Sequence, residues 1–214
     1  MHNDLTYGEI KTLFLDIGGV LLTNGWGHES RALAAQKFGL DLKEMEARHS
    51  LAFETYELGR MSLNDYLALV VFYDSRTFSR EDFKAFMLEQ SAALDGVIDY
   101  FIEIKNRHKL KVIAVSNEGR ELNEYRIKHF MLYNLFDAYI SSCYVHLHKP
   151  DISMLQMACD ISNTPPQNAL YVDDNRMLAD VAGSFGCHAL HFQGLDSTKE
   201  FIETCAFYKK PAKT

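Results

Sequence analysis

Five short apolar segments, most of them ended by polar residues or glycine, constrain the fold of this 214-residue chain more than any other feature. The first segment, residues 13–15, is followed by Asp16 and then by two adjacent glycines, Gly18 and Gly19. Short uninterrupted apolar runs that end in turn-forming residues are typical of parallel strands buried on both faces. We therefore predict strands at residues 13–15, 111–115, 138–140, 169–172 and 188–192.

Amphipathic helical patterns separate the later strands. In residues 97–109, the side chains of Val97, Phe101 and Ile104 recur on one stripe, as the helical period of 3.6 residues requires. The alternation of strands and helices predicts an α/β fold, a Rossmann-like doubly wound parallel sheet with helices on both faces. Further helices are predicted at residues 121–132, 152–160 and 177–185.

The segment between the first two predicted strands contains no convincing strand and has a helical pattern instead. Ser79, followed three residues later by Asp82, resembles a capping box at the start of a helix. A block of about 70 residues exceeds what the connection between two strands needs, so we expect it to cover the functional site. We assign residues 1–22 and 94–214 to an α/β core and residues 23–93 to an inserted all-helical cap, with helices at 28–38, 42–58, 63–73 and 80–91.

Polar residues that can carry out chemistry follow several of the predicted strands. Doubly wound sheets bind their ligands at the carboxyl ends of the strands, so these side chains are expected to meet at one edge of the sheet. Together they predict a site with a nucleophile, a hydroxyl donor, a cation and a metal-binding pair of acids. The residues are Asp16, Ser116, Asn117, Lys149, Asp173 and Asp174.

This set of side chains favours phosphoryl transfer through a covalent intermediate on Asp16. A carboxylate that attacks a phosphate dianion is repelled by it, so the site needs Mg²⁺ and fixed hydrogen-bond donors. Because Mg²⁺ prefers oxygen ligands, we expect it to bind Asp16, the Gly18 carbonyl and Asp174, with Asp173 as an outer-shell partner of the metal site. The predicted catalytic residues are Asp16, Ser116 and Lys149, and the predicted substrate-binding residues are Gly18, Gly19, Ser116, Asn117 and Lys149.

Four short motifs, in this order, resemble those of the haloacid dehalogenase-like (HAD) hydrolases. They are Asp16-Ile-Gly-Gly-Val-Leu, Val115-Ser-Asn, His148-Lys-Pro-Asp and Val172-Asp-Asp. The resemblance covers almost the whole chain, and the helical insertion is similar to a C1-type cap. The segment Phe53-Glu-Thr-Tyr-Glu-Leu-Gly-Arg-Met-Ser resembles the cap of the α-D-glucose-1-phosphate phosphatase-like subgroup. The resemblance implies a Mg²⁺-dependent phosphatase that acts on a small phosphorylated metabolite such as a sugar phosphate.

Two positions depart from the pattern of this family. Family phosphatases usually carry a second Asp, which acts as general acid and base, at the position where this chain has Gly18. Either the leaving group is unusually acidic or the cap supplies a proton donor, for which His28 is one candidate. Many members also carry Asn where Leu178 stands, and the residues that would compensate are Asn175 or Asp180.

Two other functions stay open. The first is a metal-independent 2-haloacid dehalogenase-type hydrolase, whose relatives also use an Asp nucleophile without the second Asp. The acid pair Asp173-Asp174 argues against it, because the last motif of those relatives lacks paired acids. The second is a catalytically weakened HAD domain that binds a phosphometabolite. Gly18 and Leu178 favour that function, whereas the otherwise complete set of site residues opposes it.

Composition and charge narrow the expected partners and compartment. The chain has 22 Lys and Arg residues against 29 Asp and Glu residues, a net charge of −7, which disfavours binding to nucleic acid or to anionic membranes. Its start lacks the pattern of a secretory signal, and its apolar runs are too short to cross a bilayer. We expect a cytoplasmic monomer or homodimer, with Arg120 and Arg126 as surface cations. The cysteines expected to be reduced core thiols are Cys143, Cys159, Cys187 and Cys205.

Overall fold

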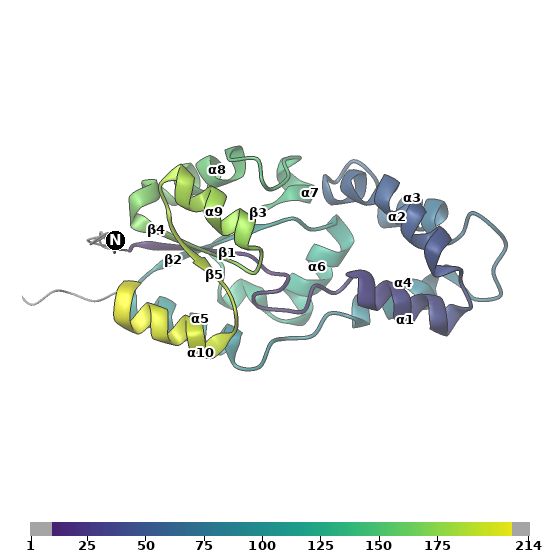
Figure 1. Ribbon diagram of the computed structural model, residues 1–214, viewed down its shortest axis with the longest axis horizontal. Helices are drawn as coiled ribbons and strands as arrows, with labels where there is room; N and C mark the ends of the chain where they lie inside the picture. Colours follow the sequence, from purple (N-terminus) through teal and green to yellow (C-terminus); the bar gives the residue numbers. More distant parts are fainter. Residues whose placement is uncertain (1–9, 207–214) are drawn as a thin grey trace, which may run out of the picture.

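The computed structural model describes residues 10–206, and its centre is a five-stranded parallel sheet with the strand order β3-β2-β1-β4-β5 (Figure 1). The central strand β1 pairs with β2 on one side and with β4 on the other. The predicted strands are confirmed to within one residue at each end, and so is the doubly wound α/β fold. The strands are β1 (Thr12–Leu15), β2 (Lys111–Ser116), β3 (Ala138–Ser141), β4 (Ala169–Asp173) and β5 (His188–His191).

Alternate residues of β1 face opposite sides of the sheet, so an apolar cluster forms on each face. Leu13 and Leu15 pack with Phe101 of α5 (Val97–His108) on one face. Phe14 packs with Met154 of α8 (Ser153–Ser162) on the other face. Figure 1 shows α5 and α10 on one side of the sheet and α8 and α9 on the opposite side. The other elements are α6 (Arg120–His129), α7 (Ser142–Val145), α9 (Arg176–Phe185), α10 (Leu195–Phe201), the 3₁₀ turns η1 (Leu132–Asn134) and η2 (Pro166–Asn168), and the π-helical turn η3 (Ile202–Ala206).

The segment between β1 and α5 folds into helices that share an apolar cluster of their own. Phe83 is fully buried there, and the Trp26 indole donates a hydrogen bond to the Tyr66 hydroxyl at 2.9 Å. Ser79 Oγ accepts a hydrogen bond from the backbone N–H of Asp82 at 3.0 Å, which confirms the predicted helix start. The helices are α1 (His28–Phe38), α2 (Leu42–Glu57), α3 (Leu63–Val70) and α4 (Arg80–Glu89), so the predicted ends of the last two were two to three residues too long.

The chain enters and leaves this helical block at one place. Leu22 and Ala93 form an isolated antiparallel bridge. The Thr23 N–H donates to the Ala92 carbonyl at 2.8 Å, so the two connections lie side by side. The block between them is the segment in which we expected a cap. We keep as a proposal the division into a cap of residues 23–93 and a core of residues 1–22 and 94–214.

The cysteines that the structure describes occupy the buried positions expected of them. Cys143, Cys159 and Cys187 are buried free thiols, whereas the side chain of Cys205 lies outside the described residues. Among residues 10–206, no helix is both long enough and apolar enough to span a membrane.

Candidate active site

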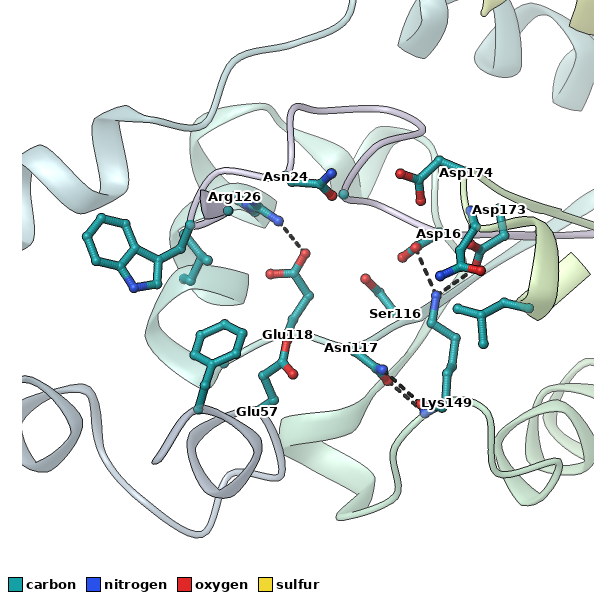
Figure 2. Close-up of a pocket in the computed structure, with 18 of the residues that line it drawn as sticks. Asp16, Asn24, Glu57, Ser116, Asn117, Glu118, Arg126, Lys149, Asp173 and Asp174 are labelled. Atoms are coloured by element: carbon teal, nitrogen blue, oxygen red, sulfur yellow. Dashed lines mark hydrogen bonds and ion pairs between the residues drawn. The ribbon is translucent and has the colours of Figure 1, made fainter. Parts of the chain in front are cut away.

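A cavity of about 360 Å³ opens at the carboxyl ends of β1, β2 and β4 (Figure 2). This is the edge at which doubly wound sheets bind their ligands. The helical block closes the cavity from the other side with Trp26, Phe53 and Glu57. The predicted site residues that line it are Asp16, Gly18, Ser116, Asn117, Lys149, Asp173 and Asp174.

The register between β1 and β4 brings Asp16 and Asp173 together. Leu15 of β1 pairs with Val172 of β4, so Asp16, which follows β1, and Asp173, the last residue of β4, lie at the same level. The Lys149 ammonium lies 2.8 Å from a carboxylate oxygen of Asp16 and 2.8 Å from one of Asp173. All three side chains are buried. The lysine therefore compensates two carboxylates that would be costly to bury alone.

The charges in this group shift the pKa values of its members. Burial alone would lower the pKa of the Lys149 ammonium, but Asp16 and Asp173 raise it above its usual value. Burial raises the pKa of Asp16 and the Asp173 carboxylate adds to this effect, whereas Lys149 and the Ser116 hydroxyl oppose it. Lys149 is thus a fixed positive charge on the floor of the cavity, which is suited to an anionic substrate.

The carboxylates of Asp16, Asp173 and Asp174 could together hold a cation. One oxygen from each of these three acids lies within 4.8 Å of the others. Burial raises the pKa of Asp174, and the negative charge of Asp173 raises it further. A divalent cation would relieve this repulsion. Because the donors are hard carboxylate oxygens, two of them from buried acids and one from the half-buried Asp174, the set fits Mg²⁺.

Asp173 is the most constrained of these acids. Its Oδ2 accepts hydrogen bonds from Lys149 Nζ at 2.8 Å and from the Tyr171 hydroxyl at 2.5 Å. Its Oδ1 accepts from the Asn175 N–H at 2.8 Å. Both oxygens are therefore used within the protein, which places Asp173 in a supporting position and leaves Asp174 the freer ligand.

The adjacent glycines of the β1 loop have different positions. Gly19 has a φ of +73°, and a Cβ atom there would lie 2.0 Å from Asp174 Oδ2. Glycine at this position therefore lets Asp174 approach the loop. Gly18 lines the cavity itself, whereas Gly19 is not among the lining residues.

Asn117 holds the loop that carries Lys149. Its Oδ1 accepts a hydrogen bond from the Lys149 N–H at 2.8 Å, and its Nδ2 donates to the Lys149 carbonyl at 3.2 Å. The side chain thus fixes the backbone on both sides of the lysine Cα, in addition to lining the cavity.

Sequence reasoning missed a buried ion pair in the wall of this cavity. Arg126 of α6 contacts Glu118, the second residue after Ser116, through Nη1 and Oε1. Arg126 is 1% exposed and Glu118 is 3% exposed, so the expectation that Arg126 is a surface cation was wrong. Arg126 also donates to the Ser91 hydroxyl at 3.1 Å. The available signal was the position of Glu118, directly after the Ser116-Asn117 motif.

Gly18 and Leu178 depart from the family pattern, and the structure shows where the residues expected to compensate for them lie. The His28 imidazole is 70% exposed and bonds to Glu46 at 3.0 Å, and it does not line the cavity. It is therefore not in place to donate a proton there. Leu178 lines the cavity and so does Asn175, whereas Asp180 belongs to a separate surface groove.

We expect Glu57 of α2 to control the charge of His148, which precedes Lys149. His148 Nε2 lies 2.9 Å from Glu57 Oε2, and this hydrogen bond raises the pKa of the imidazole. Replacing Glu57 with Gln should lower that pKa towards its ordinary value of about 6.5. An NMR titration of the His148 ring protons measures the change.

The matched control is Glu54→Gln, because Glu54 is only the last contributor to the raised pKa of His148. It should shift that pKa less than Glu57→Gln does. Because the pKa of His148 is raised in the folded state, the ion pair adds stability at low pH and is lost as the pH rises through that pKa. An unchanged titration in Glu57→Gln would contradict this assignment.

The parallel sheet carries a carboxylate after its central strand β1 and an acid pair at the end of the adjacent strand β4, the arrangement expected from the four sequence motifs. A family model described as haloacid dehalogenase-like hydrolase matches residues 10–183. The chain belongs to this family.

Solved structures with the same fold include bacterial HAD proteins. A HAD family enzyme from Bacteroides thetaiotaomicron, in a magnesium complex, has a TM-score of 0.78 at 18% identity, covering 91% of this chain and 99% of that one. A HAD-like family hydrolase from Porphyromonas gingivalis has a TM-score of 0.69 at 17% identity, covering 91% and 98%. A dehalogenase has a TM-score of 0.61 at 19% identity, covering 83% and 82%.

One curated relative is longer than this chain. Drimenol cyclase DrtB of Aspergillus calidoustus is 25% identical over 195 residues, which cover 89% of this chain. The match covers 35% of that relative, so the chain corresponds to about a third of its length.

Proposed function

We propose that this protein is a Mg²⁺-dependent phosphatase that hydrolyses a small phosphorylated metabolite, such as a sugar phosphate, through an aspartyl-phosphate intermediate. The observation that carries the proposal is the buried Asp16–Lys149 pair with Asp174 within ligand distance. Lys149 favours a dianionic phosphate, and the carboxylates favour a divalent cation. Phosphoryl transfer needs both a fixed cation for the phosphate and carboxylates that bind a divalent metal, and this cavity offers both.

Asp16 is the nucleophile in this proposal. A carboxylate oxygen of Asp16 attacks phosphorus, the ester bond to the alcohol breaks, and an aspartyl phosphate forms. Water then attacks phosphorus, which releases inorganic phosphate and restores the Asp16 carboxylate. Ser116 and Lys149 donate hydrogen bonds to the phosphoryl oxygens as their charge develops. Asn117 positions Lys149 by holding its backbone.

Asp16, Asp174 and the Gly18 carbonyl would hold the Mg²⁺ ion. When bound, the ion supplies positive charge that offsets the repulsion between the carboxylate nucleophile and the phosphate dianion. Asp173 supports this arrangement by holding Lys149 in place.

The relatives support phosphoryl transfer over dehalogenation. The B. thetaiotaomicron enzyme has been crystallised with magnesium and inorganic phosphate, and that structure has a TM-score of 0.71. An L-2-haloacid dehalogenase has a TM-score of 0.60. The acid pair Asp173-Asp174 favours the metal-dependent reaction, because a metal-independent displacement gains nothing from it.

We further propose that residues 23–93 act as a cap that limits the size of the substrate. Trp26 and Phe53 bring apolar surface into the cavity, and Glu57 brings a hydrogen-bond acceptor. In this proposal the protein works in the cytoplasm as a monomer or homodimer, without a nucleic-acid or membrane partner.

The test is a panel of phosphometabolites and 2-haloacids, assayed for released phosphate and for released halide. We expect phosphate release that stops when EDTA removes the divalent cation and returns when Mg²⁺ is added in excess. We expect no halide release. The dependence on Mg²⁺ follows from the three carboxylates that face one another in the cavity.

Two outcomes would favour the other functions. Halide release that persists in EDTA would identify a dehalogenase. Calorimetric binding of a phosphometabolite without release of phosphate would identify a weakened HAD domain that retains only its ligand.

A further inference from the structure

Neighbouring side chains crowd the position of Gly18, where family phosphatases usually carry a second acid. The backbone of Gly18 has no positive φ, so its conformation admits any residue. A Cβ atom at this position would lie 3.1 Å from Asn24 Oδ1 and 3.6 Å from Arg126 Nη1. The space beside the nucleophile loop is thus bordered by the side chains of Asn24 and of Arg126, the cation bound to Glu118.

Glu118 brings a carboxyl group into the same cavity by a different route. It follows Ser116-Asn117 on the loop after β2 and lines the cavity together with Asp16 and Gly18. Figure 2 shows its side chain extending from that loop into the cavity, with one carboxyl oxygen directed at Arg126. The hydrogen bond from Arg126 Nη1 uses Oε1 of Glu118, so Oε2 is the oxygen that can act on a ligand.

The position of this carboxyl group is fixed by several contacts. The Glu118 N–H donates to the Ser142 hydroxyl at 2.9 Å. Arg126 donates to the Ser91 hydroxyl at 3.1 Å and to the Thr23 carbonyl at 3.2 Å, so it cannot swing away from Glu118 without breaking them. A proton donor held in this way is pre-organised for a substrate that enters the cavity.

Glu118 can also exist in both protonation states near neutral pH. Burial raises the pKa of Glu118 to about 7. The negative charges of Asp16 and Glu57 raise this pKa further, whereas the positive charge of Arg126 lowers it. A general acid and base works best when its pKa lies near the working pH.

The other acids of the cavity are engaged elsewhere. Glu57 bonds to His148 at 2.9 Å, and Asp173 uses both oxygens within the protein. Asp16 and Asp174 are assigned to the nucleophile and the cation. Glu57 and Glu118 each use one carboxyl oxygen in a side-chain contact, and Glu118 is the one that follows Ser116 on the loop after β2, so proton transfer is assigned to Glu118.

We propose that Glu118 is the general acid and base of the reaction, in place of the acid absent at Gly18. This inference rests on the proposed phosphatase function. In the first step Asp16 attacks phosphorus, the bond from phosphorus to the alcohol oxygen breaks, and that oxygen takes the proton of Glu118. In the second step water attacks phosphorus and gives a proton to the Glu118 carboxylate, while the bond from phosphorus to Asp16 breaks.

The experiment compares Glu118→Gln with the wild type on phosphate esters of graded leaving-group acidity. The probes are 4-nitrophenyl phosphate, phenyl phosphate and glycerol 1-phosphate, assayed with excess Mg²⁺. A poor leaving group needs a proton and a good one does not. We therefore expect kcat/KM in the variant to fall about 10²-fold or more for glycerol 1-phosphate, with little change for 4-nitrophenyl phosphate.

Two further variants separate proton transfer from folding. Glu118→Asp keeps an acid and should recover some of the lost activity on glycerol 1-phosphate. Glu124→Gln removes a carboxylate from the exposed face of α6, where the side chain is 56% exposed, and should behave like the wild type with all three esters. Circular dichroism and thermal melting verify that each variant is folded.

The outcomes distinguish this inference from the proposed function. If the wild type releases phosphate but Glu118→Gln loses activity equally on all three esters, or on none, Glu118 is not the general acid. If the folded wild type releases no phosphate from any of the three esters or from the metabolite panel, the phosphatase function fails, and the role of Glu118 falls with it.

Discussion

Asp16→Asn is expected to reduce phosphate release at least about 10³-fold, because the amide cannot form the covalent intermediate. The fold should survive the change. Lys149 keeps its contact with Asp173 at 2.8 Å, and the variant removes one of two carboxylates that repel each other. Steady-state phosphate release measures the loss, and mass spectrometry of acid-quenched protein detects the phosphoryl adduct on the wild type.

The matched control for this prediction is Asp99→Asn. Asp99 lies in the first turn of α5 and is exposed, so its change should leave turnover intact. Equal phosphate release from Asp16→Asn and the wild type would disprove the covalent mechanism. A phosphoryl adduct on a residue other than Asp16 would do the same.

Arg126→Met is expected to cost about 3–5 kcal/mol of folding free energy, because it leaves the buried Glu118 carboxylate without its partner. It also removes the hydrogen bonds to Ser91 and Thr23. Glu118 responds by holding its proton more tightly, so the loss of stability should be smaller at low pH and grow as the pH rises. Urea denaturation at several pH values measures both effects.

The control for Arg126→Met is Arg107→Met, which breaks an exposed ion pair instead of a buried one. Arg107 contacts Glu103 on α5, with side chains that are 53% and 57% exposed. Arg107→Met should therefore cost no more than about 1 kcal/mol. Adding Glu118→Gln to Arg126→Met should recover some of the lost stability, since the unpaired charge is then gone. A loss below about 1 kcal/mol for Arg126→Met would show that Glu118 does not depend on its partner.

Two kinds of feature could be predicted from the sequence: strands, from their apolar runs, and the location of the site, from the rule that parallel strands place their carboxyl ends at one edge of the sheet. Leu13, Phe14 and Leu15 are all buried in β1, which is covered on both faces. An apolar run of this kind predicts a buried parallel strand from a single sequence. The meeting of Asp16, Ser116 and Asp173 follows from parallel strands that end at one edge. The residues of one site could therefore be predicted from separate segments, although their roles stay predictions.

The features that could not be predicted depend on contacts between distant residues. Arg126 lies on α6, a helix that is polar along most of its length, so periodicity cannot reveal which of its cations is buried. Its position is set by Glu118 and by Thr23 and Ser91, which are 103 and 35 residues away in the chain. The helix α7 has four residues, too few for a helical period to be recognised.

The paired connections at Leu22 and Ala93 make the helical block modular. Because the chain leaves the sheet and returns to it at neighbouring points, the block can lengthen, shorten or change its helices without altering the register between β1 and β2. The sheet and the block are then free to diverge at different rates. Under the proposed function, substrate choice would change through the residues that the block contributes to the cavity wall, while the carboxylates and the lysine of the sheet stay in place.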